Sequence, residues 1–519
     1  MAHSELKQSI GVWLDQQVAT APIGYDHPAE TILAWWLGFK RRLTANIKRL
    51  NHEAEARRRR PSATVQQLQT AAQEAAAALD AAPHDLGRLT AAVEAQVAVS
   101  GAMRADAKSN VLAARRSRIS EGERPSRGLT NLVHEANGGG DGGGPAPTTL
   151  RDPTSGQLIS DPARVPQIIA NYWRDVSALP TETELPTATK QAALAEVMAA
   201  LRAHPLRLPA DPEGDQLGSP EVSSAEDIKA LRATPRGKAP GWDGLPADIY
   251  KGFTRQVSPL LAALYTAIGG FGTSGSMPPQ FTDGVIKVLY KKGDPTEPGN
   301  YRPITLLNTD YRILAKALAT RLGPALSAAI SAEQTAFLPG RLIGSNIFAL
   351  RHLPHLHRRQ GRSAIVAFLD FAKAYDMVHR DFLLAAMEEL GATEQLRKWV
   401  ATLLANTRAQ ALVGGHLSTS VSMAAGVRQG CPLAPLLYLF VAQALLWWLQ
   451  KKGIGIRLDP TNPECTTAVQ FADDGQVLLD GESAVPAFLA AMQTFAAASG
   501  QRLNCTKVEL LKMPKPPIP

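Results

Sequence analysis

The sequence has 519 residues, 45% of them apolar, which is enough for a sizeable buried core and for about three domains. The net charge of +8 is mild for this length, so it is compatible with a polyanionic partner and equally with an ordinary basic protein. The three cysteines, Cys431, Cys465 and Cys505, form no CxxC pair, which argues against a disulfide framework or a zinc knuckle and fits a reducing compartment.

Residues 1–135 are predicted to form a helical, basic and alanine-rich region, broken into a helical pair near Pro83. Its first residues, MAHSELKQSI, lack the apolar core of a signal peptide. The run Arg57–Arg60 is typical of a solvated face or a localisation signal, with contact to nucleic acid as the alternative. The glycines of residues 136–149 predict a flexible linker, and the segment 150–219 shows no visible chemistry.

The density of signals rises from residue 220. A serine followed by acidic residues in SSAEDIKAL predicts a capped helix, and GVIKVLYKKGDP predicts a strand that ends in basic residues. The stretch PGNYRPITLLNTDYRILAKALATRL is interpreted as a loop leading into an amphipathic helix. Its basic residues suit a triphosphate or a nucleic-acid backbone, although lysines also gather on solvated strand edges. These residues are Lys287, Lys291, Lys292, Arg302, Arg312, Lys316 and Arg321.

The segment SAIVAFLD has the apolar run of a buried strand and ends on Asp370. An acid at the end of a buried strand is unfavourable without a partner. Asp376 and Asp381 have local explanations as turn and cap residues of a helix that begins near His379 and Arg380, whereas Asp370 has none. Asp370 is therefore a candidate functional residue.

The next stretch, RAQALVGGHLSTS, alternates like a hairpin and leads through GVRQG into the apolar run Pro432–Leu449. This run is near membrane-spanning length, but it has prolines at its start and Gln443 inside, and no second span accompanies it. We interpret it as a helix buried in a large core.

The five residues FADDG, Phe471–Gly475, lie between two strand-like flanks, TTAVQ and QVLLD. Asp-Gly is a strong hairpin-turn signal, so the turn is expected to hold two adjacent carboxylates at its tip, where they need a cation; a plain surface hairpin is the alternative. A helix over ESAVPAFLAAMQTFAAASG and a short segment, SGQRLNCTKVELLKM, follow. Residues 513–519 are predicted to be a disordered tail.

Three carboxylates, Asp370, Asp473 and Asp474, are expected to converge at one sheet edge. Mg²⁺ accepts a few carboxylates and completes its octahedron with water and substrate phosphates. Two such ions stabilise the attacking and the leaving oxygen of an in-line phosphoryl displacement. The pattern therefore predicts nucleotidyl transfer.

With these motifs in order, the chain resembles the reverse transcriptases of non-LTR (LINE-like) retrotransposons, strongly over residues 220–512 and more weakly over 110–220. The resemblance implies an α+β right-hand polymerase, with fingers at 220–360 and an antiparallel palm sheet at 361–512, preceded by a helical region. The matching stretches are KAPGWDGLPADIYK, VIKVLYKKGDPTEPGNYRPITLLNTDYRILAKALATRL, QTAFLPGRLIGSNI, AFLDFAKAYDMVHRDFL, GVRQGCPLAPLLYLF, FADDG and SGQRLNCTKVELL.

The resemblance also implies roles for individual residues. Asp370 and Asp473 look like the metal-binding pair, with Asp474 less directly ligated and Phe371 offering its backbone carbonyl. Tyr375 matches the bulky residue that excludes a 2′-hydroxyl, with a core tyrosine as the alternative.

Other roles concern the substrate. Gln429 and Gly430 match the turn that lines the nucleotide, and Lys507 matches a possible general acid, with a surface lysine as the alternative. Arg302 and one of Lys287, Lys291 and Lys292 match residues that hold the triphosphate. Nucleic-acid contacts are expected from Arg312, Lys316 and Arg341.

The implied cofactor is two Mg²⁺ ions, with Mn²⁺ as a substitute, and the implied partners are an RNA template, a DNA primer and dNTPs without a membrane. An intracellular location is expected, nuclear only by resemblance. The sequence departs from the family in lacking endonuclease motifs in residues 1–130 and a thumb after Lys507. A truncated, catalytically inactive remnant that only binds nucleic acid is therefore the alternative function, and an intron-maturase-like protein is a third.

Overall fold

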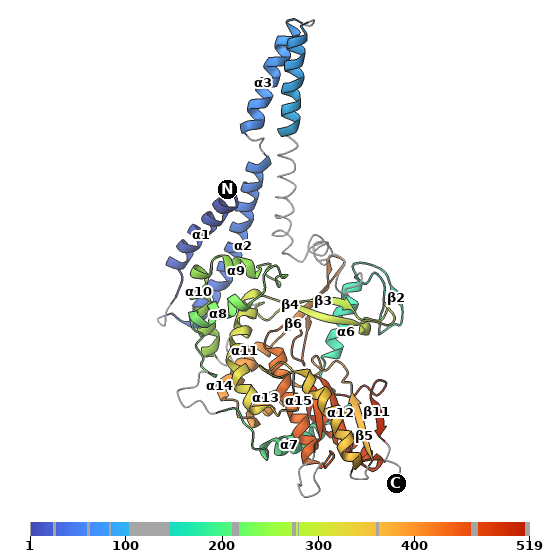
Figure 1. Ribbon diagram of the computed structural model, residues 1–519. Helices are drawn as coiled ribbons and strands as arrows, with labels where there is room; N and C mark the ends of the chain where they lie inside the picture. Colours follow the sequence, from blue (N-terminus) through green and yellow to red (C-terminus); the bar gives the residue numbers. More distant parts are fainter. Residues whose placement is uncertain are drawn as a thin grey trace. The chain divides into compact units, whose positions relative to one another are not determined.

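The computed structural model describes residues 2–23, 27–59, 63–82, 85–102, 146–209, 217–271, 277–278, 280–359, 363–457 and 466–513. The chain divides into two compact units, residues 1–21 with 35–141, and residues 22–34 with 142–519 (Figure 1). Most of the predicted glycine linker and nearly all of the predicted tail lie outside the described residues.

The described residues of the first unit form helices, as the sequence pattern indicated for that part of the chain. It contains α1 (Ala2–Ala19), most of α2 (Ala29–Arg59) and α3 (Ala63–Asp80), and residues 86–102 form a further helix beside α3 (Figure 1). The break near Pro83 is confirmed, because one helix ends at Asp80 and the next begins at residue 86. The aromatic ring of Phe39 stacks on Trp35, with a centroid distance of 5.0 Å, and helps to form the apolar contact within this unit.

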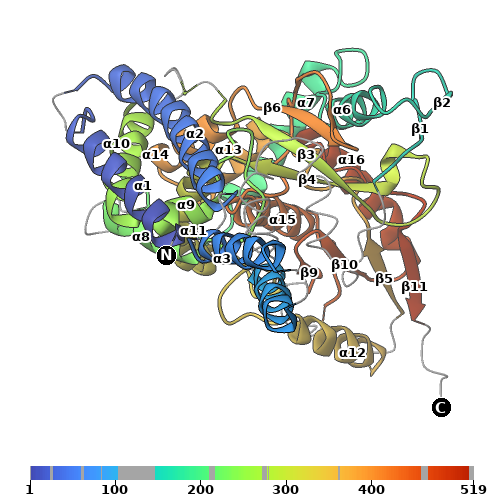
Figure 2. The ribbon, with the colours of Figure 1, turned by 90° about the horizontal axis from the view of Figure 1, so that it is seen from above.

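A four-stranded antiparallel sheet lies in the second unit, with strand order β11-β5-β10-β9. Figure 2 shows these strands in a row, and α12 packs against β5 and β9. Most hydrophobic side chains of β5, β9 and β10 are buried, which agrees with the apolar runs in the sequence, whereas Leu510 and Leu511 of the edge strand β11 are exposed. The strands are β5 (Ala364–Leu369), β9 (Ala468–Phe471), β10 (Asp474–Leu479) and β11 (Glu509–Met513).

A second sheet has the order β4-β3-β6-β7, with β8 also paired to β6. The interpretation of residues 301–307 as a loop was wrong, because they form β4 and pair with β3 along its whole length. A proline interrupts the alternation of apolar and polar residues in YRPITLL. The pairing of this segment with β3 nevertheless makes it a strand. The strands are β3 (Gly284–Tyr290), β4 (Tyr301–Leu307), β6 (Arg408–Val413), β7 (His416–Leu417) and β8 (Val421–Ser422).

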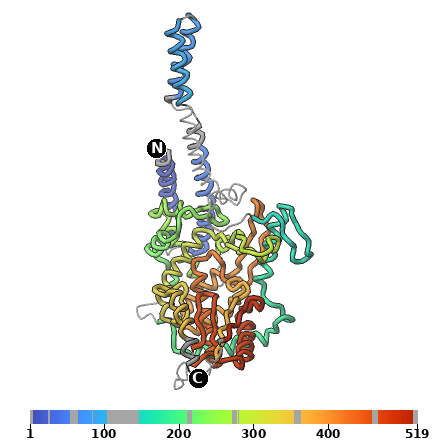
Figure 3. Tube along the Cα trace, turned by 45° about the vertical axis from the view of Figure 1, so that its right-hand side comes forward, coloured from blue at the N-terminus to red at the C-terminus, as the bar shows by residue number. Residues whose placement is uncertain are grey.

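The helices of the second unit surround these sheets. Within this unit, the tube in Figure 3 shows the green stretch of α8 to α10 and the red C-terminal stretch toward opposite ends. A small sheet of β1 (Leu150–Arg151) and β2 (Leu158–Ile159) precedes α6, which packs on β6. The helices are α6 (Val165–Val176), α7 (Thr187–Arg202), α8 (Ser224–Ala233), α9 (Ala247–Gly252), α10 (Thr254–Phe271), α11 (Thr309–Ala329), α12 (Ile343–Arg359), α13 (Arg380–Glu389), α14 (Glu394–Leu404), α15 (Ala434–Lys451) and α16 (Val485–Ser499), with 3₁₀ turns η2 (Pro298–Asn300) and η3 (Glu482–Ala484).

The apolar run after GVRQG forms α15, and its residues from Ala434 to Leu449 are almost all buried, as predicted. Gln443 is satisfied inside this core, because its amide donates to Ser331 Oγ and its carbonyl oxygen accepts from Ser331 N at 2.8 Å. Across the described ranges, no helix is long and apolar enough to cross a membrane.

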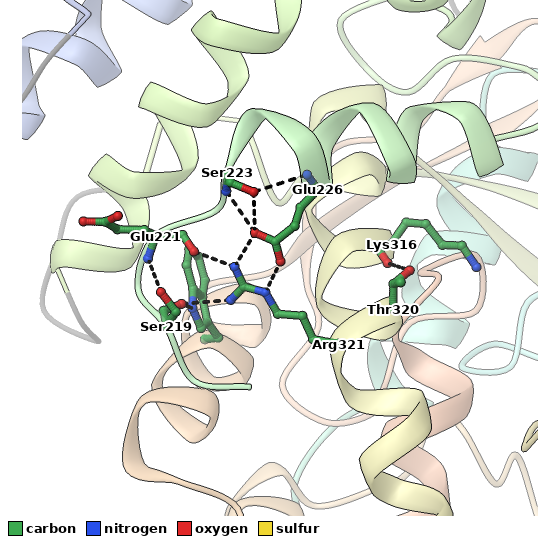
Figure 4. A network of polar contacts seen from close by, with 8 residues as sticks. Ser219, Glu221, Ser223, Glu226, Lys316, Thr320 and Arg321 are labelled. Atoms are coloured by element: carbon green, nitrogen blue, oxygen red, sulfur yellow. Dashed lines mark hydrogen bonds and ion pairs between the residues drawn. The ribbon is translucent and has the colours of Figure 1, made fainter. Parts of the chain in front are cut away.

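The capped helix predicted at SSAEDIKAL is α8. The Ser223 hydroxyl accepts from Glu226 N, and the Glu226 carboxylate accepts from Ser223 N, which is a complete capping box. Arg321 on α11 donates to the same carboxylate and to backbone carbonyls of the segment before α8 (Figure 4). This network fastens α8 to α11.

Candidate active site

The carboxylates of Asp370 and the hairpin meet at one end of the four-stranded sheet. Asp370 directly follows β5, as predicted. Gly475 on β10 is paired with Leu369 on β5, so the next position in this antiparallel register brings Asp474 opposite Asp370. The sheet therefore brings together two acids that are separated by about a hundred residues in the chain.

The hairpin turn differs from the expected one. Phe471 pairs with Asp474, so the two turn residues are Ala472 and Asp473, and the Asp-Gly pair lies at the start of β10. Asp473 is thus at the tip, whereas Asp474 is the first residue of the strand. The turn uses a left-handed Ala472, with φ of +58°, a conformation that costs a non-glycine residue roughly 1–2 kcal/mol.

Gln334, which sequence reasoning did not select, offsets this strain. Its side chain is fully buried, and it contacts both backbone groups of Ala472. The Gln334 Oε1 accepts from Ala472 N at 3.0 Å, and its Nε2 donates to Ala472 O at 3.2 Å. No local pattern in QTAFLPG marks this glutamine, because its partner Ala472 is far away in the chain.

The carboxylates influence one another. Burial raises the pKa of the Asp473 carboxyl, the negative charges of Asp474 and Asp370 raise it further, and the Arg302 guanidinium opposes them. One oxygen of Asp370, Oδ2, accepts from Lys507 Nζ at 3.2 Å and from Asn504 Nδ2 at 3.0 Å. The structure thus brings Asp370, Asp473, Asp474, Arg302 and Lys507 into one polar site.

The loop after Asp370 carries Tyr375. Burial raises the pKa of the Tyr375 phenol, and the negative charges of Asp473 and Asp474 raise it further. The ring stacks on Tyr438, which lines the same small cavity as Asp473. Phe371, earlier in this loop, forms an isolated bridge with Leu503. The hydrogen bonds of that bridge use the Asp370 carbonyl and the backbone N–H of the residue after Phe371, so they leave the Phe371 carbonyl unused.

Gln429 lies in a tight turn beside this loop. Its Nε2 donates to Asp376 Oδ2 at 2.7 Å, so Asp376 is more than the local turn residue that the sequence suggested. Burial raises the pKa of the Asp376 carboxyl to about 7, although Gln429 and Lys373 both favour its charged form. Gly430 has φ of +115°, and a Cβ there would meet the Thr305 carbonyl at 2.3 Å, so this turn requires glycine.

The basic residues of β3 and β4 divide between two faces. Arg302 is paired with Leu289, and residues two apart on a strand share a face, so Lys287 and Lys291 fall on the Arg302 side. Lys292 has the opposite parity. Burial lowers the pKa of Lys373, in the loop after Asp370, and the charge of Lys291 lowers it further, whereas Asp376 acts to raise it.

The three residues expected to bind nucleic acid have different surroundings. The Arg341 guanidinium donates to four backbone carbonyls at the end of α11 and just after it. Burial lowers the pKa of Arg312, which donates to Thr309 Oγ1. Lys316 on α11 is partly exposed, and Figure 4 shows its side chain extending away from the Arg321 network. The four contacts of Arg341 therefore stabilise the C-terminal end of α11.

The site fits a divalent cation that also takes ligands from its substrate. Within the described part of the chain, no group of three or more His, Cys, Asp or Glu side chains is arranged as a metal site. Asp370 and Asp473 offer two carboxylates, and the Phe371 carbonyl is available beside them. Mg²⁺ is commonly held by one or two carboxylates together with water and phosphate oxygens, so this set suits it.

Comparison with known proteins gives a consistent family. Residues 290–516 match the family model described as reverse transcriptase (RNA-dependent DNA polymerase). A 149 kDa protein of transposon TX1 from Xenopus laevis is 32% identical over 290 residues, which is 55% of this chain and 22% of that protein. The Pol polyprotein of the type-1 retrotransposable element R2 from Popillia japonica is 31% identical over 235 residues, 45% of this chain and 32% of that protein.

The RNA-directed DNA polymerase from mobile element jockey of Drosophila melanogaster is 28% identical over 301 residues, 54% of this chain and 31% of that protein. The aligned parts thus span about a fifth to a third of these relatives. The match and the named relatives agree with the motifs recognised in the sequence. Residues 290–516 are a reverse transcriptase domain of the non-LTR, LINE-like type.

Proposed function

We propose that this chain is an RNA-directed DNA polymerase that adds dNTPs to a DNA primer on an RNA template. The observation that supports it most directly is the meeting of Asp370 and Asp473 at one end of an antiparallel sheet, with Arg302 near them. Carboxylates that repel each other need a cation between them, and a substrate triphosphate needs basic groups on the other side.

We also propose a division into fingers at 220–360 and palm at 361–512, in which β6 to β8 of the second range complete the β3–β4 sheet. The sheet with β5 and β10 supplies the acids, and the sheet with β3 and β4 supplies Arg302 and the lysines on its face. Of the lysines, Lys291 has the better support as a triphosphate ligand because its charge acts on the loop after β5. The segment 150–219 contributes α6 to the core of the β3–β4 sheet.

The chain's residues have distinct proposed tasks. Asp370 and Asp473, with the Phe371 carbonyl, hold the metal ions, and Asp474 supports them from the start of β10. When bound, two Mg²⁺ ions stabilise the negative charge that develops on the attacking and leaving oxygens. Lys507 donates a proton to the leaving pyrophosphate, and Gln429 and Gly430 line the nucleotide.

Tyr375 excludes a 2′-hydroxyl. A ring beside the carboxylates leaves no room for the extra oxygen of a ribonucleotide, so dNTPs are selected by shape. The cavity that Tyr438 and Asp473 line, with the Tyr375 ring stacked on Tyr438, supports this assignment.

The alternative of an inactive remnant that only binds nucleic acid has less support. A remnant is under no constraint to keep the acids, the ring and the basic face together, and here all three adjoin one site. Neighbouring carboxylates repel one another and cost stability without a cation, so their grouping fits retained use.

The proposal is tested by incorporation of a dNTP on a primed RNA template with Mg²⁺. The parent is expected to extend the primer, and Asp473→Asn is expected to abolish extension. Asp175→Asn is the control, because this exposed acid pairs with its sequence neighbour Arg174. Equal extension by the parent and Asp473→Asn, or no extension by the parent with Mg²⁺ or Mn²⁺, would sink the proposal.

A further inference from the structure

The ring of Tyr375 stacks on a second tyrosine ring that lies behind it. Tyr438 on α15 is 2% exposed, and its centroid is 4.5 Å from that of Tyr375 with 18° between the planes. Two rings at this distance and angle stabilise each other and limit the positions that either can take. Tyr438 belongs to the apolar run that first suggested only a core helix.

A third residue fixes the second ring. The Tyr438 hydroxyl donates to Gln501 Oε1 at 3.0 Å. The other end of the same amide, Gln501 Nε2, donates at 2.9 Å to the carbonyl of Ala374, the residue before Tyr375. One buried glutamine therefore holds both the backbone of the Tyr375 loop and the ring behind Tyr375.

The local backbone explains how Gln501 reaches this place. Gly500 ends α16 in the left-handed conformation, with φ of +79°, and a Cβ there would meet the Met377 carbonyl at 2.3 Å. The turn can therefore lie directly on the Tyr375 loop. His379 N donates to Ser499 O at 2.8 Å and adds a second attachment.

We propose that Tyr438 and Gln501 are positioning residues that hold the Tyr375 ring in place and thereby set the discrimination between deoxyribo- and ribonucleotides. The inference deepens the proposed function and rests on it. A ring that excludes one oxygen atom must be held to within a fraction of an ångström, and a second shell of contacts is what fixes it. Without the stack, Tyr375 can move aside and admit a 2′-hydroxyl.

The test compares incorporation of a dNTP and the matching rNTP by the full chain. Tyr438→Leu, which removes the stacked ring, is expected to lower the dNTP/rNTP ratio of kcat/KM by about tenfold. Tyr438→Phe keeps the ring and loses the hydroxyl, so its ratio should fall between those of the parent and Tyr438→Leu. Tyr250→Leu is the control, because it removes another fully buried tyrosine, far from Tyr375 in the sequence and on α9.

The result that overturns the inference is a Tyr438→Leu variant whose kcat/KM falls equally for both nucleotides, as in the control. A double-mutant cycle of Tyr375→Ala and Tyr438→Leu, measured by free energy of unfolding, tests the contact without any activity. Coupled effects support the inference, and additive effects overturn it. An inactive parent would instead contradict the proposed function, so the two failures are distinguishable.

Discussion

The ammonium of Lys507 lies 3.2 Å from Oδ2 of Asp370, the same oxygen that accepts from Asn504. The carboxylate assigned to the metal is thus engaged by two donors in this state. A cation bound through Oδ2 would compete with these two donors, and Lys507 would then be released toward the leaving group. This relationship links the metal requirement to the proposed general acid.

We predict that Lys507→Ala lowers kcat by about 100-fold, because a positioned general acid contributes roughly that much. The same change is expected to lower the Mg²⁺ concentration that gives half-maximal rate, since Asp370 loses a competing cation. Both are measured by primer extension over a Mg²⁺ titration. Lys512→Ala is the control, because Lys512 pairs with exposed Glu482. An unchanged kcat would show that Lys507 is a surface lysine.

We predict that Gln334→Leu destabilises the protein by about 2 kcal/mol, because it removes two hydrogen bonds from Ala472 and leaves the strained turn unsupported. Extension activity should fall with it, since Asp473 is the next residue of that turn. Free energies of unfolding from denaturant titrations provide the measurement.

Ala472→Gly is the matching rescue. Glycine adopts a φ of +58° without steric cost, so adding this change to Gln334→Leu should restore about 1 kcal/mol. Failure of the rescue would mean that strain at Ala472 is not what Gln334 offsets.

Local sequence patterns predicted some elements of the fold and missed others. The buried strand before Asp370, the helix at His379 and the capping box at Ser223 depend on local patterns, and all three are confirmed. The strand at Tyr301–Leu307 was missed, because a proline interrupts its alternation and its conformation depends on pairing with β3.

In the candidate site, too, only the residues marked by local motifs were predicted. The acids could be named from their motifs, whereas Gln334, Tyr438 and Gln501 could not, because each acts on a residue at least sixty positions away. The role of a buried polar residue depends on its hydrogen-bond partner, which the sequence does not identify. The expected Asp-Gly turn failed for another reason: Gln334 stabilises an alanine in the position that glycine would usually take.

We predict a pH effect from Asp376. Burial raises its pKa in the folded chain from 3.8 to about 7, so the folded state binds the extra proton between these values. Its contribution to the free energy of unfolding is therefore present at low pH and is lost as the pH rises through about 7. Asp376→Asn has no carboxyl to ionise, so its free energy of unfolding does not fall in this way. It should be more stable than the parent at pH 8, but not at pH 4.

The same residue tests the contact with Gln429. Asparagine still offers an oxygen to Gln429 Nε2, so Asp376→Asn should keep the KM for dNTP, whereas Asp376→Ala should raise it with kcat little changed. Equal KM values for all three proteins would mean that the contact does not orient Gln429 for the nucleotide.

We predict that Arg341→Ala lowers stability without selectively weakening RNA binding. Its guanidinium donates to four carbonyls at and just after the end of α11, where a helix leaves carbonyls without intrahelical partners. Lys316→Ala should show the reverse, a weaker RNA affinity and a shallower salt dependence, with unchanged unfolding. RNA-binding curves at several salt concentrations compare the two variants. A shallower salt dependence for Arg341→Ala would show that Arg341 does contact nucleic acid.

The neighbouring acids Glu226 and Asp227 should respond in opposite ways to neutralisation. Glu226 is bound by Arg321 and Ser223, and these contacts lower its pKa although burial acts to raise it. Asp227 is 1% exposed, neither carboxylate oxygen has a hydrogen-bond partner, and burial raises its pKa to about 8. Above its ordinary pKa of 3.8, folding must therefore keep Asp227 protonated or bury its charge.

Glu226→Gln is accordingly expected to lose about 1 kcal/mol at neutral pH, because it weakens a charge-assisted contact. Asp227→Asn should be more stable than the parent at pH 9, and this advantage should shrink by about 1.4 kcal/mol for each pH unit below 8. Near pH 4 the two proteins should unfold alike, since the parent is then protonated in both states. Denaturant titrations at pH 4, 6.5 and 9 give the comparison. A constant difference between Asp227→Asn and the parent across this range would show that Asp227 is ionised in the folded chain, with its charge stabilised by Arg321 in the same way as that of Glu226.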